Sequence, residues 1–209
     1  GFRWTGGQLV GMTLQLGPGK HAIMGDNGQR LLASTVINDG QLRLQDAGVA
    51  LAFTGYNQSA LLTNTAAGEC ELSGHSRLFQ VNPGGWPPLA LALVNEGTLR
   101  ASGNETNAIE QIPLHNRGAI EVNSGLLRQS AGGTSPGKVF LADGARFELG
   151  GAVYNLDGGE WTGPGAARIT GSSRLLGIFR ADNFGLAAGD LDGAFDVTGG
   201  FAWTGGRFV

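Results

Sequence analysis

The sequence is poor in cysteine, proline and charge. Its 209 residues include one cysteine, seven prolines and only 15% charged residues. A single cysteine excludes a small scaffold held together by intrachain disulfides. Irregularly spaced glycines with few prolines exclude collagen, and a hydrophobic content of 41% excludes a disordered tail. The chain is therefore expected to fold around an apolar core.

Clusters of basic residues and long apolar runs are also missing. The formal net charge is −3, and no Lys/Arg cluster is present to neutralise a run of phosphates, so we expect no nucleic-acid partner. No apolar run approaches the roughly 20 residues that span a bilayer, so we expect no membrane insertion of this segment. The chain begins with Gly1 and has no signal-peptide pattern at its start. We expect it to be a fragment of a longer repetitive chain.

Motifs for catalysis, metal binding or phosphate binding are lacking as well. His21, His75 and His115 are isolated, and none lies in a zinc-binding pattern. The sequence has no nucleophile elbow and no phosphate-binding loop. Cys70 alternates with two glutamates that disfavour a reactive thiolate, and we expect it to be a small core residue. No cofactor, no bound metal and no enzymatic activity are predicted.

Glycine, in contrast, is abundant. The chain has 38 glycines, and some of them lie in internal repeats. Residues 1–7 and 200–206 nearly match around Trp4 and Trp203, and a partial copy surrounds Trp161. Trp161 and Trp203 are 42 positions apart, which suits two turns of about 21 residues. Because the tryptophans lie inside the repeat, we expect them to stack in or near the core.

A second motif places Asn or Asp shortly before a glycine that opens a short alternating segment. Gly97 and Gly118 are 21 positions apart, and Gly118 and Gly159 are 41 apart. The interval of 57 positions from Gly40 to Gly97 is interpreted, loosely, as three shorter turns. Corners often require a positive φ, which glycine adopts and asparagine tolerates. We therefore expect the recurring glycines to lie at corners with positive φ angles.

These patterns predict an all-β solenoid. Period-2 alternation after each turn glycine indicates short strands with one buried face. Such strands are unstable alone but pair when successive turns stack at about 4.8 Å. We expect residues 1–209 to form one parallel β-helix domain with nine or ten rungs and corner loops. An all-β sandwich of antiparallel hairpins is the competing architecture.

Two irregular segments, residues 73–88 and 129–138, are expected to project as loops. The first contains three of the seven prolines. Within it, Arg77, Phe79 and Trp86 form the candidate for an exposed contact, because a loop tryptophan beside a cation is typical of binding surfaces.

Carboxylates near the end of the sequence are the other candidate site. Asp190 and Asp192, with Asp196 nearby, have the residue types of a calcium site or of an acid pair in a polysaccharide-cleaving solenoid. Their cationic partners are not evident in the sequence. Carboxylates are also common at corners, and we favour that interpretation.

The turn glycines, Asn-x-Gly corners and Trp-Thr-Gly-Gly segments resemble the repetitive shafts of haemagglutinin-like and autotransporter adhesins of bacteria. That resemblance covers most of the chain and implies a right-handed parallel β-helix, secretion to the cell surface, and a role as a stalk or adhesive fibre. End-to-end self-association and host or cell-surface glycans are the partners to expect. The alternative function is a carbohydrate-binding or polysaccharide-degrading β-helix.

Overall fold

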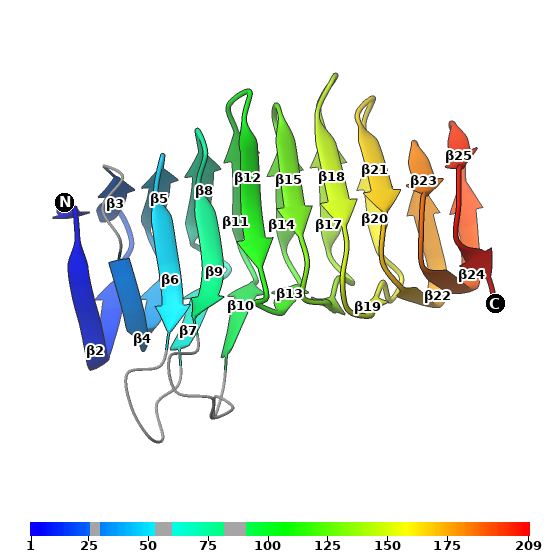
Figure 1. Ribbon diagram of the computed structural model, residues 1–209. Coiled ribbons are helices and arrows are strands. Elements are labelled where there is room, and N and C mark those ends of the chain that lie inside the picture. Colours follow the sequence, from blue (N-terminus) through cyan, green and yellow to red (C-terminus); the bar gives the residue numbers. More distant parts are fainter. Residues whose placement is uncertain (26–29, 53–59, 82–90) are drawn as a thin grey trace.

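Three parallel sheets wind around a common interior in the computed structural model, which describes residues 1–25, 30–52, 60–81 and 91–209 (Figure 1). Each turn of the chain adds one short strand to each sheet, and we name the sheets A, B and C. The described residues form strands and turns without a helix. Pairing between the strands is parallel. The predicted parallel β-helix is confirmed, and the antiparallel sandwich is wrong.

Sheet A includes the strands that follow the corner glycines of the Asn-x-Gly motif. Their alternating residues place one set of side chains inside and the other outside. The strands are β1 (Phe2–Trp4), β3 (His21–Gly25), β5 (Gln41–Gln45), β8 (Glu69–Ser73), β11 (Thr98–Ser102), β14 (Ala119–Val122), β17 (Lys138–Leu141), β20 (Glu160–Thr162), and the second halves of β22 (Ser173–Ala181) and β24 (Asp190–Val197).

Sheet B follows sheet A in every turn. Two of its members are the first halves of long strands that continue around the next corner. It consists of those halves of β2 (Gly7–Leu16) and β4 (Arg30–Asn38), and of β6 (Gly48–Ala52), β9 (Arg77–Val81), β12 (Thr106–Glu110), β15 (Leu126–Gln129), β18 (Arg146–Leu149), β21 (Ala166–Ile169), β23 (Phe184–Leu186) and β25 (Phe201–Trp203).

Sheet C closes each turn before the chain returns to sheet A. It contains the second halves of β2 and β4, β7 (Ala60–Asn64), β10 (Leu91–Asn95), β13 (Leu114–Asn116), β16 (Gly133–Thr134), β19 (Tyr154–Asn155), the first halves of β22 and β24, and β26 (Arg207–Phe208). Among the described residues each sheet thus stacks ten strand segments. Ten segments are nine steps along the axis, in agreement with the predicted nine or ten rungs.

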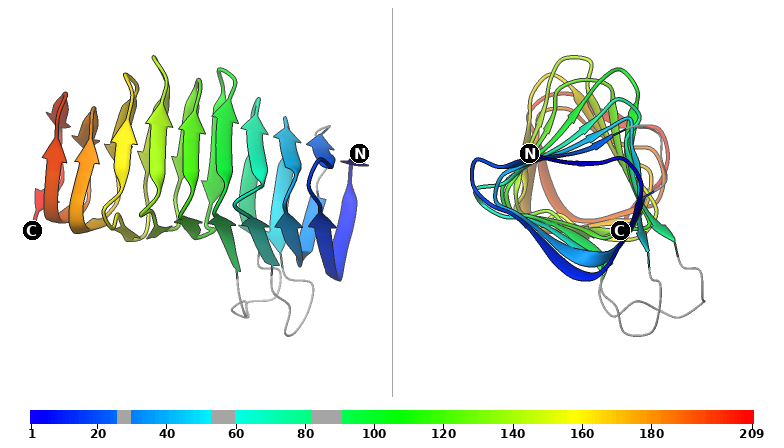
Figure 2. Two further views of the ribbon diagram at one scale, coloured as in Figure 1. Left: turned by 180° about the vertical axis from the view of Figure 1, so that it is seen from behind. Right: turned by 90° about the vertical axis from the view of Figure 1, so that its left-hand side faces the viewer.

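The coil is right-handed. In Figure 1 the chain advances from left to right while sheet A strands run upward behind and sheet B strands run downward in front. The view along the axis in Figure 2 shows the turns enclosing one interior, and Figure 1 shows the two chain ends at opposite ends of the body. The handedness implied by the resemblance is therefore confirmed.

Turn length is uneven in the first half of the chain. Leu42 pairs with Cys70, and Cys70 pairs with Leu99, so two long turns follow one another here. The next turns are clearly shorter, because Leu99 pairs with Ile120 and Ile120 pairs with Val139. The interval from Gly40 to Gly97 is thus two long turns, and the prediction of three shorter turns is wrong.

The tryptophan motif does not mark equivalent positions. Trp161 lies in sheet A and pairs with Val139, whereas Trp203 lies in sheet B and pairs with Leu186. The interval between these two tryptophans is therefore not two complete turns. Trp4 also lies in sheet A, but beside Met24 in a different column from Trp161. The prediction of two turns of about 21 residues between Trp161 and Trp203 is wrong.

Both predicted irregular segments contribute strands to the solenoid. Residues 77–81 form β9 of sheet B, and Gly133–Thr134 form β16 of sheet C. In both segments, short strands joined by corners that contain glycine and serine lie along the body of the solenoid. The prediction that all of 73–81 and 129–138 projects as loops is wrong, while residues 82–88 lie outside the described residues.

A ladder of buried asparagines joins the corners between sheets C and A. The Nδ2 of Asn38 donates to the Oδ1 of Asn64, Asn64 donates to Asn95, and Asn95 donates to Asn116, each over 2.7 Å. Asn116 Nδ2 then donates to Ser135 Oγ at 3.2 Å. All four asparagines are fully buried. Satisfied amides of this kind stabilise the corner, because an unpaired buried amide is costly.

The glycines next to this ladder serve close approach rather than unusual φ angles. A Cβ on Gly97 would overlap the carbonyl oxygens of Gly68 and Thr65, and one on Gly118 would overlap that of Gly97. Neither Gly97 nor Gly118 has a positive φ. The predicted reason for these glycines is therefore wrong, and the turns simply leave no room for a side chain.

Candidate functional site

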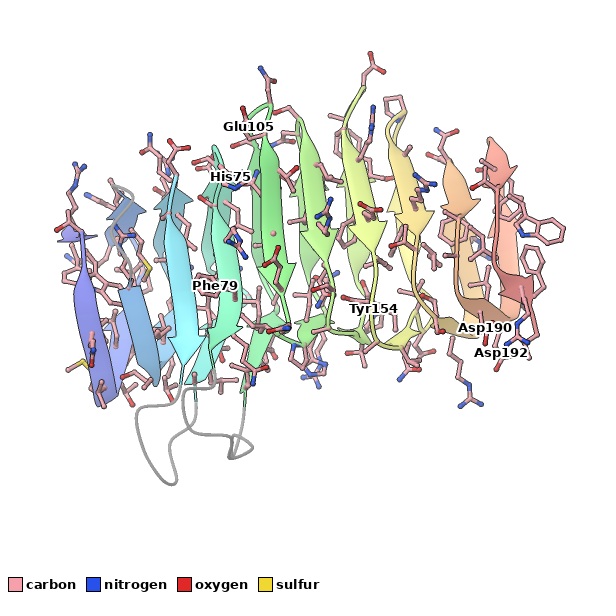
Figure 3. The ribbon with its side chains drawn as sticks, viewed as in Figure 1. His75, Phe79, Glu105, Tyr154, Asp190 and Asp192 are labelled. Atoms are coloured by element: carbon pink, nitrogen blue, oxygen red, sulfur yellow. The ribbon has the colours of Figure 1, made fainter. Side chains whose placement is uncertain are left out.

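The predicted contact residues Arg77 and Phe79 lie together on the outer surface of β9. The Arg77 guanidinium carbon is 5.1 Å from the centre of the Phe79 ring, and the same guanidinium pairs with Glu110 of β12. Ala108 is the neighbour of Arg77 on β12, and its small side chain leaves room for this diagonal ion pair. Figure 3 shows Phe79 on that surface. Trp86, the third member of the prediction, lies outside the described residues.

Asp190 and Asp192 each have an arginine one turn away. Asp190 accepts two hydrogen bonds from Arg207, at 2.9 and 2.8 Å. Asp192 lies 3.6 Å from the Nε of Arg174. Both aspartates lie at the C-terminal end of sheet C in Figure 3. These cations could not be identified from the sequence, because the register of the short last turns was needed to pair them.

This arrangement neutralises each carboxylate separately. The hydrogen bonds from Arg207 lower the pKa of Asp190, so it is charged at neutral pH and holds no proton to donate as a general acid. An acid pair in a glycosidase instead needs one carboxyl whose pKa is raised. Within the described residues no group of three His, Cys, Asp or Glu side chains is close enough to hold a metal ion.

Replacing Arg207 by glutamine is expected to raise the pKa of Asp190 toward that of an ordinary aspartate. Because Arg207 depresses this pKa in the folded chain, the ion pair stabilises the fold above the unfolded-chain pKa, and this stabilisation is lost as pH falls through the lower folded-state value. Carboxyl carbon NMR titration measures the change, with the exposed Asp143 as internal control. An Asp190 titration that does not move would contradict the ion pair.

The three histidines lie far apart in the fold. His21 is in β3, His75 is at an exposed corner, and His115 is half-buried on the outer face of β13. His115 Nδ1 is 3.1 Å from Thr134 Oγ1. Partial burial and the nearby Arg117 lower the pKa of His115, so its imidazole is neutral at pH 7.

Cys70 is a core residue, as predicted. It is fully buried between Leu42 and Leu99 in the inner column of sheet A. Burial, together with the charge of Glu71, raises the pKa of the Cys70 thiol to about 12. A thiol with this pKa carries almost no thiolate at neutral pH and is a poor nucleophile.

Two of the tryptophans, Trp4 and Trp161, lie in the interior of the solenoid. Trp4 and Trp161 are buried, as predicted, whereas Trp203 in the last described turn is 60% exposed, against the prediction. Aromatic rings continue along the interior, with 5.4 Å between the ring centres of Phe147 and Trp161 and 6.2 Å between those of Trp161 and Phe184. Sugar-stacking platforms need exposed rings, so Trp4 and Trp161 are not such a platform.

Tyr154 is a further buried aromatic residue, and Figure 3 labels it. It lies in the inner column of sheet C between Gly133 and Ser173, and these small neighbours make room for its ring. Burial raises the pKa of the Tyr154 hydroxyl. The ring is therefore a neutral part of the core and is not available to a ligand on the outer surface.

The outer face of sheet C carries a polar row that the sequence patterns did not reveal. His115 pairs in register with Thr134, Thr134 with Asn155, Asn155 with Arg174, and Arg174 with Asp192. The spacing of these residues along the chain changes from turn to turn. The signal is present in the sequence, but it is visible only once the length of each turn is known. We call these five residues the sheet C row.

A shallow depression of about 370 Å³ lies where sheet C meets sheet A near the N-terminal end. Lys20, Asp39 and Glu69 supply its charged groups. Asp39 already accepts hydrogen bonds from Thr65 Oγ1 at 2.6 Å and from Gln15 Nε2 at 3.3 Å. These bonds tie neighbouring turns together, so the depression is a corner held by inter-turn contacts.

No protein-family model, curated protein or solved structure matches this chain. In the part of the chain that the structure describes, no helix is long and apolar enough to cross a membrane. The function must therefore be inferred from the architecture and from the surfaces described above.

Proposed function

We propose that this chain is a non-enzymatic, extracellular structural or adhesive element, a stiff β-solenoid stalk. The observation that carries the proposal is the unbroken stacking of all three sheets in register. Repetitive solenoids gain stability from neighbouring turns, and such a rod holds whatever it displays at a fixed distance from its base.

Stiffness has a physical basis in the contacts between turns. Bending requires one side of the stack to open, which breaks parallel backbone hydrogen bonds there. The asparagine ladder resists opening at one corner. On the outer face of sheet A, Arg43 pairs with Glu71 at 3.1 Å, and Arg100 pairs with Glu121 at 2.7 Å. Each surface ion pair contributes little stability, but these pairs add to the stability that the continuous backbone hydrogen bonds provide.

The two ends of the described solenoid support its extension into a longer fibre. At the C-terminal end the inward-directed positions of the last turn, Phe201, Trp203 and Phe208, are 39%, 60% and 42% exposed. At the other end Phe2 is 40% exposed. Apolar cross-sections and open sheet edges favour stacking of further turns. We propose that a longer chain or a second copy, stacked end to end, supplies them.

Electron microscopy of the chain at increasing concentration is expected to show rods of constant width that lengthen end to end. One copy should measure about 45 Å along its axis, from the spacing of stacked strands. Trp203→Glu places a charge on the apolar end and should shorten the rods severalfold. Phe140→Glu is the matched control, because Phe140 is 45% exposed on the side of the body.

Compact, isolated particles from both this chain and its longer parent would contradict the fibre. Equal shortening by Trp203→Glu and Phe140→Glu would contradict the end as the contact. Immunogold labelling of intact cells that produce the parent tests the location separately. Label on the outer surface supports the stalk, and label confined to the cell interior would overturn the extracellular proposal.

The alternative, a carbohydrate-binding β-helix, is favoured by one specific observation, the sheet C row. Rows of hydrogen-bonding side chains on a flat, rigid sheet suit an extended polar polymer. A glycan on the sheet C face is compatible with a stalk, since the ends and the side faces are separate surfaces.

A further inference from the structure

The sheet C row has hydrogen-bonding capacity that the fold does not use. The side chain of Asn155 makes no hydrogen bond to the described residues. The side chains of His115 and Thr134 bond only to each other within the described part of the chain, through one ring nitrogen and one hydroxyl. Arg174 approaches Asp192 at 3.6 Å, which is longer than a hydrogen bond and leaves guanidinium N–H groups available.

The row is also electrically balanced. His115 is neutral at pH 7 because burial and Arg117 lower its pKa, and Thr134 and Asn155 are uncharged. The positive charge of Arg174 is offset by Asp192. A polyanion therefore finds no excess positive charge here, and a polycation finds no excess negative charge. The chemistry suits a neutral ligand with many hydroxyl groups.

An apolar contact lies beside the row. Val153 precedes β19 by one residue and is 54% exposed. It is two residues from Asn155, so the two side chains belong to neighbouring columns of the same surface. Sugar rings present both hydroxyl groups and apolar C–H faces, and a protein surface that combines both contacts fits them.

The spacing between adjacent strands determines which shape of ligand fits the row. Successive members of the row lie on adjacent strands, which are about 4.8 Å apart. Extended β-linked neutral polysaccharides advance by about one such spacing for each sugar. A chain lying parallel to the solenoid axis therefore places one sugar over each turn, from His115 to Asp192.

We propose that the sheet C row binds a neutral, linear β-linked polysaccharide that lies along the solenoid axis. This inference rests on the stalk proposal only in that the row needs the stacked turns to stay in register. Several outward-facing charges on the other two sheets are paired between turns, such as Arg43 with Glu71 and Arg128 with Glu148.

Affinity electrophoresis of the 209-residue chain in gels containing soluble β-glucan, xylan or galactomannan tests the proposal. At least one of these neutral polymers should retard the chain. Thr134→Val removes one hydroxyl from the row with little change of shape and should weaken binding about tenfold, as should Asn155→Ala. A tenfold loss of affinity corresponds to about 1.4 kcal/mol. Thr162→Val is the matched control, because Thr162 is half-buried on the outer face of sheet A.

Three results would overturn the site. Retardation by none of the neutral polymers excludes the ligand class, and retardation only by alginate or heparin, abolished by salt, shows an electrostatic contact instead. Equal losses in Thr134→Val and Thr162→Val exclude sheet C as the surface. Electron microscopy of the same variants separates this failure from failure of the stalk, because rods that form normally without binding leave the stalk intact.

Discussion

Replacing Asn95 by alanine is expected to lower the free energy of unfolding by about 3 kcal/mol or more. Asn95 accepts a hydrogen bond from Asn64 and donates to Asn116 Oδ1 and to the carbonyl of Ala119, at 2.7, 2.7 and 2.9 Å. Alanine removes all three bonds. The buried Asn116 Oδ1 and the part-buried carbonyl of Ala119 then lose this donor, and an unsatisfied buried group costs about 1–3 kcal/mol.

The expected loss of stability is large because of the position of Asn95 within the ladder. Asn95 is fully buried, so water cannot replace the lost partners without opening the corner. The four amides also donate in one direction along the axis, and aligned hydrogen bonds polarise one another. A break in the middle therefore weakens the neighbours on both sides as well.

Urea unfolding, followed by circular dichroism, measures the change. Asn104→Ala is the matched control, because Asn104 lies at an exposed corner and should change the free energy of unfolding by less than about 0.5 kcal/mol. If Asn95→Ala and Asn104→Ala unfold at the same urea concentration, the asparagines do not form a stabilising ladder.

The fold was predictable from the sequence because its signals are local. A turn glycine followed by alternating apolar residues indicates a half-buried strand wherever it occurs, as at Gly118 and Ile120. Constant spacing between two such signals, the 21 positions from Gly97 to Gly118, then measures the length of one turn. Neither inference requires knowledge of distant contacts.

The register of the strands was harder to predict, because it depends on the lengths of all the preceding turns. Two long turns precede Leu99, whereas the turn from Ala181 to Val197 is much shorter. Similar sequences around Trp161 and Trp203 therefore fall on different sheets. A local motif reports a corner and a strand, but not which of three corners it occupies.

The candidate sites depended on register and were correspondingly less predictable. Asp190 and Asp192 were recognised as a cluster, but Arg207 and Arg174 are their partners only because of the short final turns. Asn64 was not recognised as a corner asparagine, since its glycine, Gly68, follows four positions later rather than two. Because the corner asparagines are buried, their side-chain amides serve as hydrogen-bonding groups between turns rather than as turn formers.

Gly97→Ala is expected to destabilise the chain by about 3 kcal/mol or more, the upper part of the range for overpacking. The added Cβ would overlap the carbonyl oxygens of Gly68 and Thr65, which belong to the backbone of the preceding turn. Backbone held in a parallel ladder cannot move aside as the end of a flexible side chain can. Turns would have to separate at the corner, and the adjacent hydrogen bond between Asn64 and Asn95 would lengthen with them.

Two other glycines separate this steric effect from backbone conformation. Gly144 has a φ of +72° with open space around a Cβ, so Gly144→Ala should cost about 1–2 kcal/mol from the left-handed conformation alone. Gly17 has open space and no positive φ, so Gly17→Ala should be neutral or stabilise by about 0.4–1 kcal/mol. Urea midpoints should therefore fall in the order Gly17→Ala, Gly144→Ala, Gly97→Ala. A Gly97→Ala chain as stable as Gly17→Ala would mean that the turns do not approach as closely as the stacked corners require, and the tight three-sided coil itself would be wrong.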